Sequence, residues 1–259
     1  MTKIKTTLLD WTYTPKNYLE KPISISFDGG LLQIEHGKAS ATVDLRIYQT
    51  NISLRDELTG IIESRLLAAQ IMTHKVFELS KATRTDVEDD GKLHHYLEID
   101  SCYQRVTVSS IDLVVKDRNG VVVADSKRER LNKQEWYAVQ IEKFRPSDAT
   151  LDQILKSYQA SVLDPDNELI RLYEVRESLA TKFGSRVAAT GHLGLTNHQW
   201  AEIGELANHH PFNQGRHRGK SVGFLRDAKA PELELARKSV VLLIEKYLEF
   251  LSNKDQAGV

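Results

Sequence analysis

Cysteine is almost absent from the sequence, and membrane-directing segments are missing as well. Cys102 is the only cysteine, so an intramolecular disulfide and a thiolate zinc cage are both excluded. No stretch approaches the ~20 apolar residues that a membrane-spanning helix needs, and residues 1 to 11 lack the apolar core of a secretion signal. We therefore expect a cytosolic protein with no membrane partner.

The sequence also lacks an excess of charge and lacks the glycine-rich loops that cradle nucleotide phosphates. Its 35 lysines and arginines face 36 aspartates and glutamates, which gives a net charge of -1. Gly29 and Gly30 stand outside any GxxxxGK[ST] or GxGxxG pattern. This balance excludes a general electrostatic attraction to nucleic acid, so any contact with a polyanion must be local.

The patterning that is present predicts an α+β protein whose first half is rich in strands. The composition is that of a globular protein, with 41% hydrophobic and 27% charged residues. Apolar residues alternate with polar ones over residues 23 to 27 and again from Ala39 to Ile47, which is typical of half-buried strands. Apolar residues then recur at helical spacing from Leu54 to Thr73, which predicts one amphipathic helix.

From Ser147 onward the apolar spacing becomes helical. Stripes over residues 151 to 162, 169 to 183, 200 to 206 and 233 to 251 predict a bundle of about four helices. Thr196 and Gln199 form a capping box before the third stripe. Residues 131 to 144 fit either period. We predict a mixed α/β domain over residues 1 to 146 and a helical bundle domain over residues 147 to 259.

The most basic stretch of the chain lies before the final predicted helix. Arg216, His217, Arg218 and Lys220 follow one another on a loop with glycines on both sides. Guanidinium forks there can bind phosphates, and Phe212 can offer a stacking face for a base. The alternative is that these arginines pair with neighbouring acids and tie the loop to the bundle, the acids being Glu202, Glu205 and Asp227.

The helical half, roughly residues 169 to 251, resembles the HEPN group of small helical bundles from prokaryotic toxin and phage-defence proteins. The resemblance rests on Arg216-His217 and on the long final helix, and the family cleaves RNA with an Arg and a His a few residues apart. Asn208 stands where that Arg is expected, and the only correctly spaced pair, Arg186 with His192, lies in a glycine-interrupted segment between helices. The resemblance therefore implies a non-catalytic form that dimerises or contacts RNA.

A second polar cluster lies on a predicted hairpin in the first half. Residues 106 to 117 and 121 to 127 are β-branched runs joined by Asn119-Gly120, which suits a tight turn. The register of such a hairpin places Val114 opposite Asp125 and Asp112 opposite Lys127, with the polar groups on one face. Two carboxylates and a lysine there can bind Mg²⁺ and orient a water, whereas the alternative is a simple cross-strand ion pair.

The hairpin is similar in its spacing to the PD-(D/E)xK nuclease family. Carried over to this sequence, the family implies that Asp112 and Asp125 are metal ligands, that Lys127 positions the nucleophile and that Glu63 is an additional helix acid. The sequence departs from the family in having no proline before Asp112. Mg²⁺ is the only cofactor this reading implies.

Three functions remain open from the sequence. The first is a cytosolic prokaryotic protein that binds nucleic acid or a protein partner through Arg216, His217, Arg218 and Lys220. The second is an Mg²⁺-dependent nuclease that uses Asp112, Asp125 and Lys127. The third is a non-catalytic assembly subunit that forms a homodimer.

Overall fold

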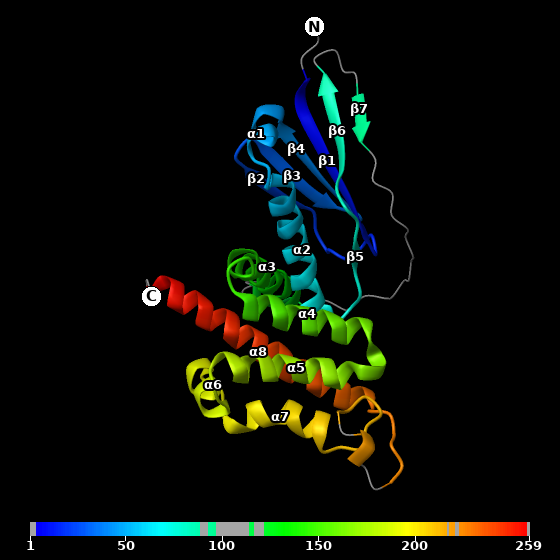
Figure 1. The fold of residues 1–259 in the computed structure, drawn as a ribbon, viewed down its shortest axis with the longest axis vertical. Helices are drawn as coiled ribbons and strands as arrows, with labels where there is room; N and C mark the ends of the chain where they lie inside the picture. Colours follow the sequence, from blue (N-terminus) through cyan, green and yellow to red (C-terminus); the bar gives the residue numbers. More distant parts are fainter. Residues whose placement is uncertain are drawn as a thin grey trace. The chain divides into compact units, whose positions relative to one another are not determined.

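The computed structural model describes residues 4–88, 93–96, 114–116, 122–216, 218–220 and 223–257, and it shows an α+β fold (Figure 1). The strands of this part are β1 Ile4–Thr14, β2 Ile23–Phe27, β3 Gly30–Glu35, β4 Lys38–Asp44, β5 Glu78–Leu79, β6 Thr83–Glu88, β7 Leu93–Tyr96, β8 Val114–Lys116 and β9 Val122–Asp125. The helices are α1 Leu45–Thr50, α2 Leu54–Thr73, α3 Ser126–Phe144, α4 Ala149–Leu163, α5 Glu168–Lys182, α6 Arg186–Leu193, α7 Asn197–Asn208 and α8 Ala230–Gln256, with short 3-10 turns at η1 Pro165–Asn167 and η2 Arg218–Lys220.

The chain forms two compact units. The β unit comprises Met1–Ala69 and Phe77–Glu135, and the helical unit comprises Gln70–Val76 and Trp136–Val259. The division between the units falls inside α2 and α3. The predicted domain boundary after residue 146 stays a prediction, because compactness alone does not show where an independently folding domain begins.

An antiparallel sheet dominates the β unit. Its strand order is β2-β3-β4-β1-β6-β7, and β5 pairs separately with β1. Alternate residues of β1 are buried, namely Leu9, Trp11 and Tyr13, as the period-2 pattern of a half-buried strand requires. The Trp11 indole Nε1 donates a hydrogen bond to Thr59 Oγ1, 3.1 Å away, which fixes α2 against the face of the sheet that carries Trp11. The predicted helix over residues 54 to 73 is confirmed in full.

The predicted strand from Ala39 to Ile47 ends earlier than the alternation indicates. The Asp44 side chain accepts hydrogen bonds from the backbone N–H groups of Arg46 and Ile47, at 2.8 and 3.4 Å. This N-cap starts α1 at Leu45, so Leu45 and Ile47 are helical. The extension of the strand beyond Asp44 was therefore wrong, because a local capping interaction outcompetes sheet pairing at that point.

Buried tyrosines connect the helices of the helical unit. Tyr137 donates its hydroxyl proton to Glu245 Oε2 at 2.9 Å, which links α3 to α8. Tyr247 on α8 donates to Asp148 Oδ1 at 2.9 Å, at the start of α4. Burial raises the pKa of both hydroxyls, so both remain protonated donors. These bonds fix the register of α8 against its neighbours.

A buried carboxylate anchors the start of α5. Glu168 Oε1 and Oε2 accept hydrogen bonds from Arg237 Nε and Nη2 at 2.6 and 2.9 Å, and His74 Nε2 lies 3.3 Å from Oε1. Burial alone would raise the pKa of Glu168, but the bonds from His74 and Arg237 outweigh it and lower that pKa. His74 Nδ1 lies 3.3 Å from the Tyr158 hydroxyl, which completes the network.

Two segments of the second half differ from expectation. The ambiguous residues 131 to 144 belong to α3, and the segment from Arg186 to His192 is part of helix α6 rather than a connection between helices. Gly194, with φ of 61°, ends α6 in the left-handed region that glycine favours. The predicted capping box of Thr196 with Gln199 is confirmed at the start of α7. Within the described ranges no helix is long and apolar enough to cross a membrane.

Candidate functional site

Backbone hydrogen bonds hold the basic loop, residues 208–229, together and join it to α7. Arg226 N donates to Pro211 O at 3.0 Å, Asn213 N donates to Arg226 O at 2.9 Å, and Arg216 N donates to Ala207 O at 2.7 Å. Phe212 is 1% exposed, and its ring stacks on His210 with a centroid distance of 5.0 Å. The expectation that Phe212 offers a face to a base was therefore wrong, because this ring is part of the core.

The exposed aromatic ring of the loop is Phe224. Its side chain is fully exposed, whereas large apolar side chains are ordinarily at least half-buried. The sequence places it close to Arg226 and Lys220, so it sits on the basic stretch itself. The residue was missed in the sequence because an isolated phenylalanine carries no signal of its exposure.

Two of the four predicted phosphate-binding residues have side chains in the described part of the chain. Arg216 Nη1 donates to Glu177 Oε1 at 3.0 Å, and its guanidinium carbon lies 4.3 Å from the centroid of the Tyr173 ring. Arg218 Nη2 donates to the Asp166 carbonyl oxygen at 2.8 Å and to Asn167 Oδ1 at 2.6 Å. His217 and the side chain of Lys220 lie outside the described residues.

The acids that pair with the arginines of the loop are not the ones that the sequence analysis offered as the alternative. Arg216 pairs with Glu177, and Arg226 donates two hydrogen bonds to Glu232 at 2.8 and 2.6 Å. These bonds lower the pKa of Glu232 to about 2, with the Lys229 backbone N–H as a second cause. The expected partners bind elsewhere: Asp227 accepts from Asn213 and Gln214, Glu202 from Ser239, and Glu205 lies near His209.

Arg176 on α5 lies on the same aromatic ring as Arg216. Its guanidinium carbon is 5.2 Å from the Tyr173 centroid and 5.5 Å from the Trp200 centroid, and the side chain is half-buried. Burial lowers the pKa of Arg176, and the nearby charge of Arg186 adds to this effect. The spacing of Tyr173 and Arg176 puts them on one face of α5. Trp200 lies near Arg176 because α7 packs against α5.

The carboxylate cluster predicted on the hairpin is only partly described. Val114 pairs with Asp125, as the hairpin register predicted. Lys127, however, is the second residue of α3 and not part of a strand. The prediction that Lys127 pairs with Asp112 across the hairpin was therefore wrong, because Lys127 lies in the helix. Asp112 lies outside the described residues.

Asp125 has a structural role at the start of α3. Its Oδ1 accepts a hydrogen bond from the backbone N–H of Arg128 at 3.0 Å, which is the geometry of an N-cap. Glu63, the candidate helix acid, is half-buried on α2. In the residues that the structure describes, no group of three His, Cys, Asp or Glu side chains is placed to hold a metal ion. An Mg²⁺ site that includes Asp112 stays a prediction.

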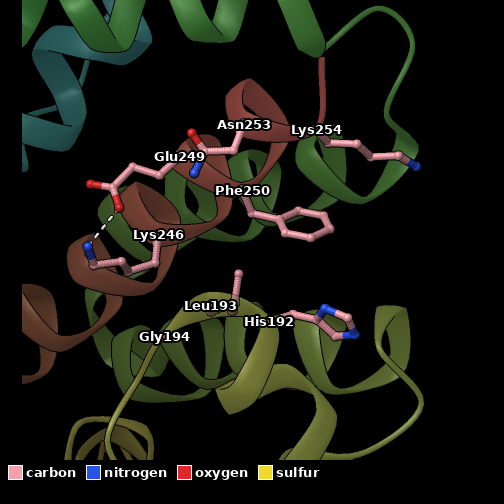
Figure 2. Close-up of a pocket in the computed structure, with 8 residues that line it drawn as sticks. All are labelled: His192, Leu193, Gly194, Lys246, Glu249, Phe250, Asn253 and Lys254. Carbon is pink, nitrogen blue, oxygen red and sulfur yellow. Dashed lines mark hydrogen bonds and ion pairs between the residues drawn. The ribbon is translucent and has the colours of Figure 1, made fainter. Parts of the chain in front are cut away.

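An open depression of about 510 Å³ lies between the end of α6 and the last turns of α8. Figure 2 shows the Phe250 ring beside His192, and their centroids are 5.9 Å apart. Lys246 Nζ binds Glu249 Oε2 at 2.7 Å, so these two polar side chains neutralise each other. The other polar side chains of the lining are His192, Asn253 and Lys254, and Glu249 is the one carboxylate among these described lining residues.

Comparisons with protein-family models, with curated proteins and with solved structures find no match. The resemblances to the HEPN group and to PD-(D/E)xK nucleases stay predictions.

Proposed function

We propose that the chain binds nucleic acid without cleaving it, through the basic loop and the adjoining face of α5. The observation that carries this proposal is the positive charge of Arg218. Residues 208–229 hold five lysines and arginines against one aspartate, and two of the five, Arg216 and Arg226, pair with Glu177 and Glu232 outside this range. Arg218 donates hydrogen bonds to a carbonyl and an amide oxygen, both neutral, so its charge is not cancelled by an ion pair within the described part of the chain.

The chemistry of the loop suits a strand of phosphates and bases. Guanidinium groups bind phosphate oxygens through paired N–H donors, and Arg218 is held in place by its bonds to the η1 turn. Phe224 offers an exposed ring on which a base can stack. A single-stranded ligand fits best, because its bases are free to stack, whereas those of a duplex are already paired.

The geometry of α6 supports binding rather than cleavage. Arg186 and His192 are six positions apart on one helix, which separates them by ~9 Å along the axis and by roughly 120° around it. Arg186 Nη2 donates to Asn197 Oδ1 at 3.0 Å, while His192 stacks on Phe183 with a centroid distance of 5.1 Å. The two side chains therefore have different neighbours and do not converge on one reacting group.

The test is the salt dependence of binding to a labelled single-stranded oligonucleotide, measured by fluorescence anisotropy. A variant with Arg216, His217, Arg218 and Lys220 replaced by alanine loses three formal charges. If each lost charge binds one phosphate, the slope of log K against log salt is shallower by about 2 in the variant than in the wild type, because the contacts on α5 remain. An identical slope and affinity for the two proteins would exclude the loop as the binding surface.

A matched control removes the same formal charge elsewhere on the helical unit. Lys156, Lys238 and Lys254 are exposed, and their replacement by alanine should leave the slope unchanged. A reciprocal variant, Glu177→Gln, removes the carboxylate that holds Arg216 and should tighten binding severalfold. Weaker binding by Glu177→Gln would show that Arg216 needs its partner for positioning and does not contact phosphate.

A further inference from the structure

Arg176 is a cation that lies against two aromatic rings. Its guanidinium lies against the rings of Tyr173 and Trp200, and within the described residues no hydrogen bond or ion pair engages its N–H groups. A guanidinium carries five donors in a fixed plane, and stacking on rings leaves the edge of that plane available. Donors that remain open beside the rings are suited to an anion from outside the chain.

A glycine on α7 makes this position possible. A Cβ atom at Gly204 would stand 1.9 Å from Arg176 Nη1 and 3.1 Å from its guanidinium carbon. Glycine is the poorest helix former after proline, yet it occupies the interior of α7, where no turn or positive φ requires it. The space next to Gly204 is filled by the guanidinium, so this glycine serves to admit the Arg176 side chain.

The charges near Arg176 are of both signs. Arg186 is close enough for its charge to act on Arg176, and Arg216 lies on the shared Tyr173 ring at 4.3 Å. Glu177 and Glu205 act on Arg176 as well, but Glu177 is paired with Arg216 and Glu205 lies near His209. The two guanidinium groups on the Tyr173 ring repel each other, and a bound anion would relieve that repulsion.

We propose that the Arg176 guanidinium, held on Trp200 and Tyr173 by the space at Gly204, is a phosphate-binding group of the helical unit. That the phosphate belongs to a nucleic-acid strand rests on the proposed function. Arg186, whose charge acts on Arg176, and Arg216, which shares the Tyr173 ring, are additional donors to the same strand. The site extends the binding surface from the loop onto α5. It gives a function to Arg176, which is not part of the loop.

Gly204→Ala is the sharpest test, because it removes no charge and improves helix propensity while displacing the guanidinium. Oligonucleotide affinity should fall about ten-fold, the equivalent of one charge-assisted contact. Gly191→Ala is the matched control, since a Cβ there meets nothing within 4 Å. Arg176→Lys, which keeps the charge but lacks the fork, should lose affinity to a similar extent and serves if Gly204→Ala does not fold.

Inorganic phosphate distinguishes the site from the proposed function. The Trp200 ring lies 5.5 Å from the Arg176 guanidinium carbon, so its indole N–H resonance reports on the site in an NMR titration with phosphate, run against chloride at equal ionic strength. We expect a saturable shift in the wild type that is lost in Gly204→Ala. If phosphate shifts the resonance but the protein does not bind the oligonucleotide, the site binds free phosphate and the nucleic-acid proposal is wrong. Absence of a shift, with equal oligonucleotide affinity of wild type and Gly204→Ala, would overturn the site and leave the loop proposal intact.

Discussion

Replacement of Arg237 by methionine tests the buried network at the start of α5. The Glu168 side chain is 3% exposed and the Arg237 side chain is 29% exposed, so the substitution strands a buried carboxylate. Methionine keeps most of the apolar stem of the arginine, which confines the change to the lost charge and its two hydrogen bonds. The perturbation therefore measures electrostatics rather than packing.

The expected cost follows from the geometry. Removing one partner of a buried ion pair destabilises a protein by about 3 to 5 kcal/mol. His74 still lies 3.3 Å from Glu168, and the arginine was partly exposed, so we expect the lower end, about 3 kcal/mol. Lys238→Met is the control, because Lys238 is 72% exposed and should cost no more than about 0.5 kcal/mol.

The loss should depend on pH with a defined sign. The pKa of Glu168 is lowered in the folded protein, so its stabilisation is complete above the unfolded pKa of about 4.3 and is lost as the pH falls through the folded pKa. In Arg237→Met the burial of Glu168 is less opposed, and its pKa rises. The difference between the two proteins should therefore be largest near neutral pH and shrink in acid.

Urea denaturation followed by far-UV circular dichroism provides the free energies of unfolding of the wild type and of Arg237→Met at neutral pH and in acid. A difference below about 1 kcal/mol at neutral pH would refute the assignment of Arg237 as the principal partner of Glu168. A difference that grows in acid would contradict the sign of the pKa shift.

Two further predictions concern local structure. Asp125→Ala should destabilise the chain by about 1 kcal/mol in a denaturation measurement, whereas Asp125→Asn should be nearly neutral, because asparagine also caps helices; equal losses would mean that the charge matters and not the cap. Gly37→Ala should cost more than Gly194→Ala, since both have positive φ but only a Cβ at Gly37 would meet Lys16, at 2.7 Å from Cγ. Equal melting temperatures for these two variants would contradict the role of that close approach.

Local signals in the sequence were sufficient for the regular elements they specify. The apolar period over residues 54 to 73 and the Thr196 capping box each describe a few turns of chain, and both are confirmed. The strand ending was misjudged at Asp44, and α6 was missed, because alternation and glycine content are averages over several residues. A single capping side chain or a left-handed glycine decides an element boundary, and both are visible only in the backbone.

The same distinction applies to the candidate site, where some features follow from neighbouring residues in the sequence and others follow only from the fold. The charge of the loop from Arg216 to Lys220 is readable in the sequence, since adjacent basic residues remain adjacent in space. The burial of Phe212 and the exposure of Phe224 were not readable, because each depends on which face the folded loop turns toward the core. The pairing of Arg216 with Glu177 joins residues 39 positions apart and lay outside the reach of any local pattern.

By itself, the sequence determined the α+β class, most of the helices and the place where positive charge accumulates, because these depend on residues near one another in the chain. The tertiary structure alone decided that Asp125 caps a helix, that Lys127 leaves the hairpin, and that Arg176 rests on Trp200 beside Gly204. These contacts join separate helices and depend on how the elements pack. The placement of the Arg176 guanidinium on two aromatic rings is a property of that packing.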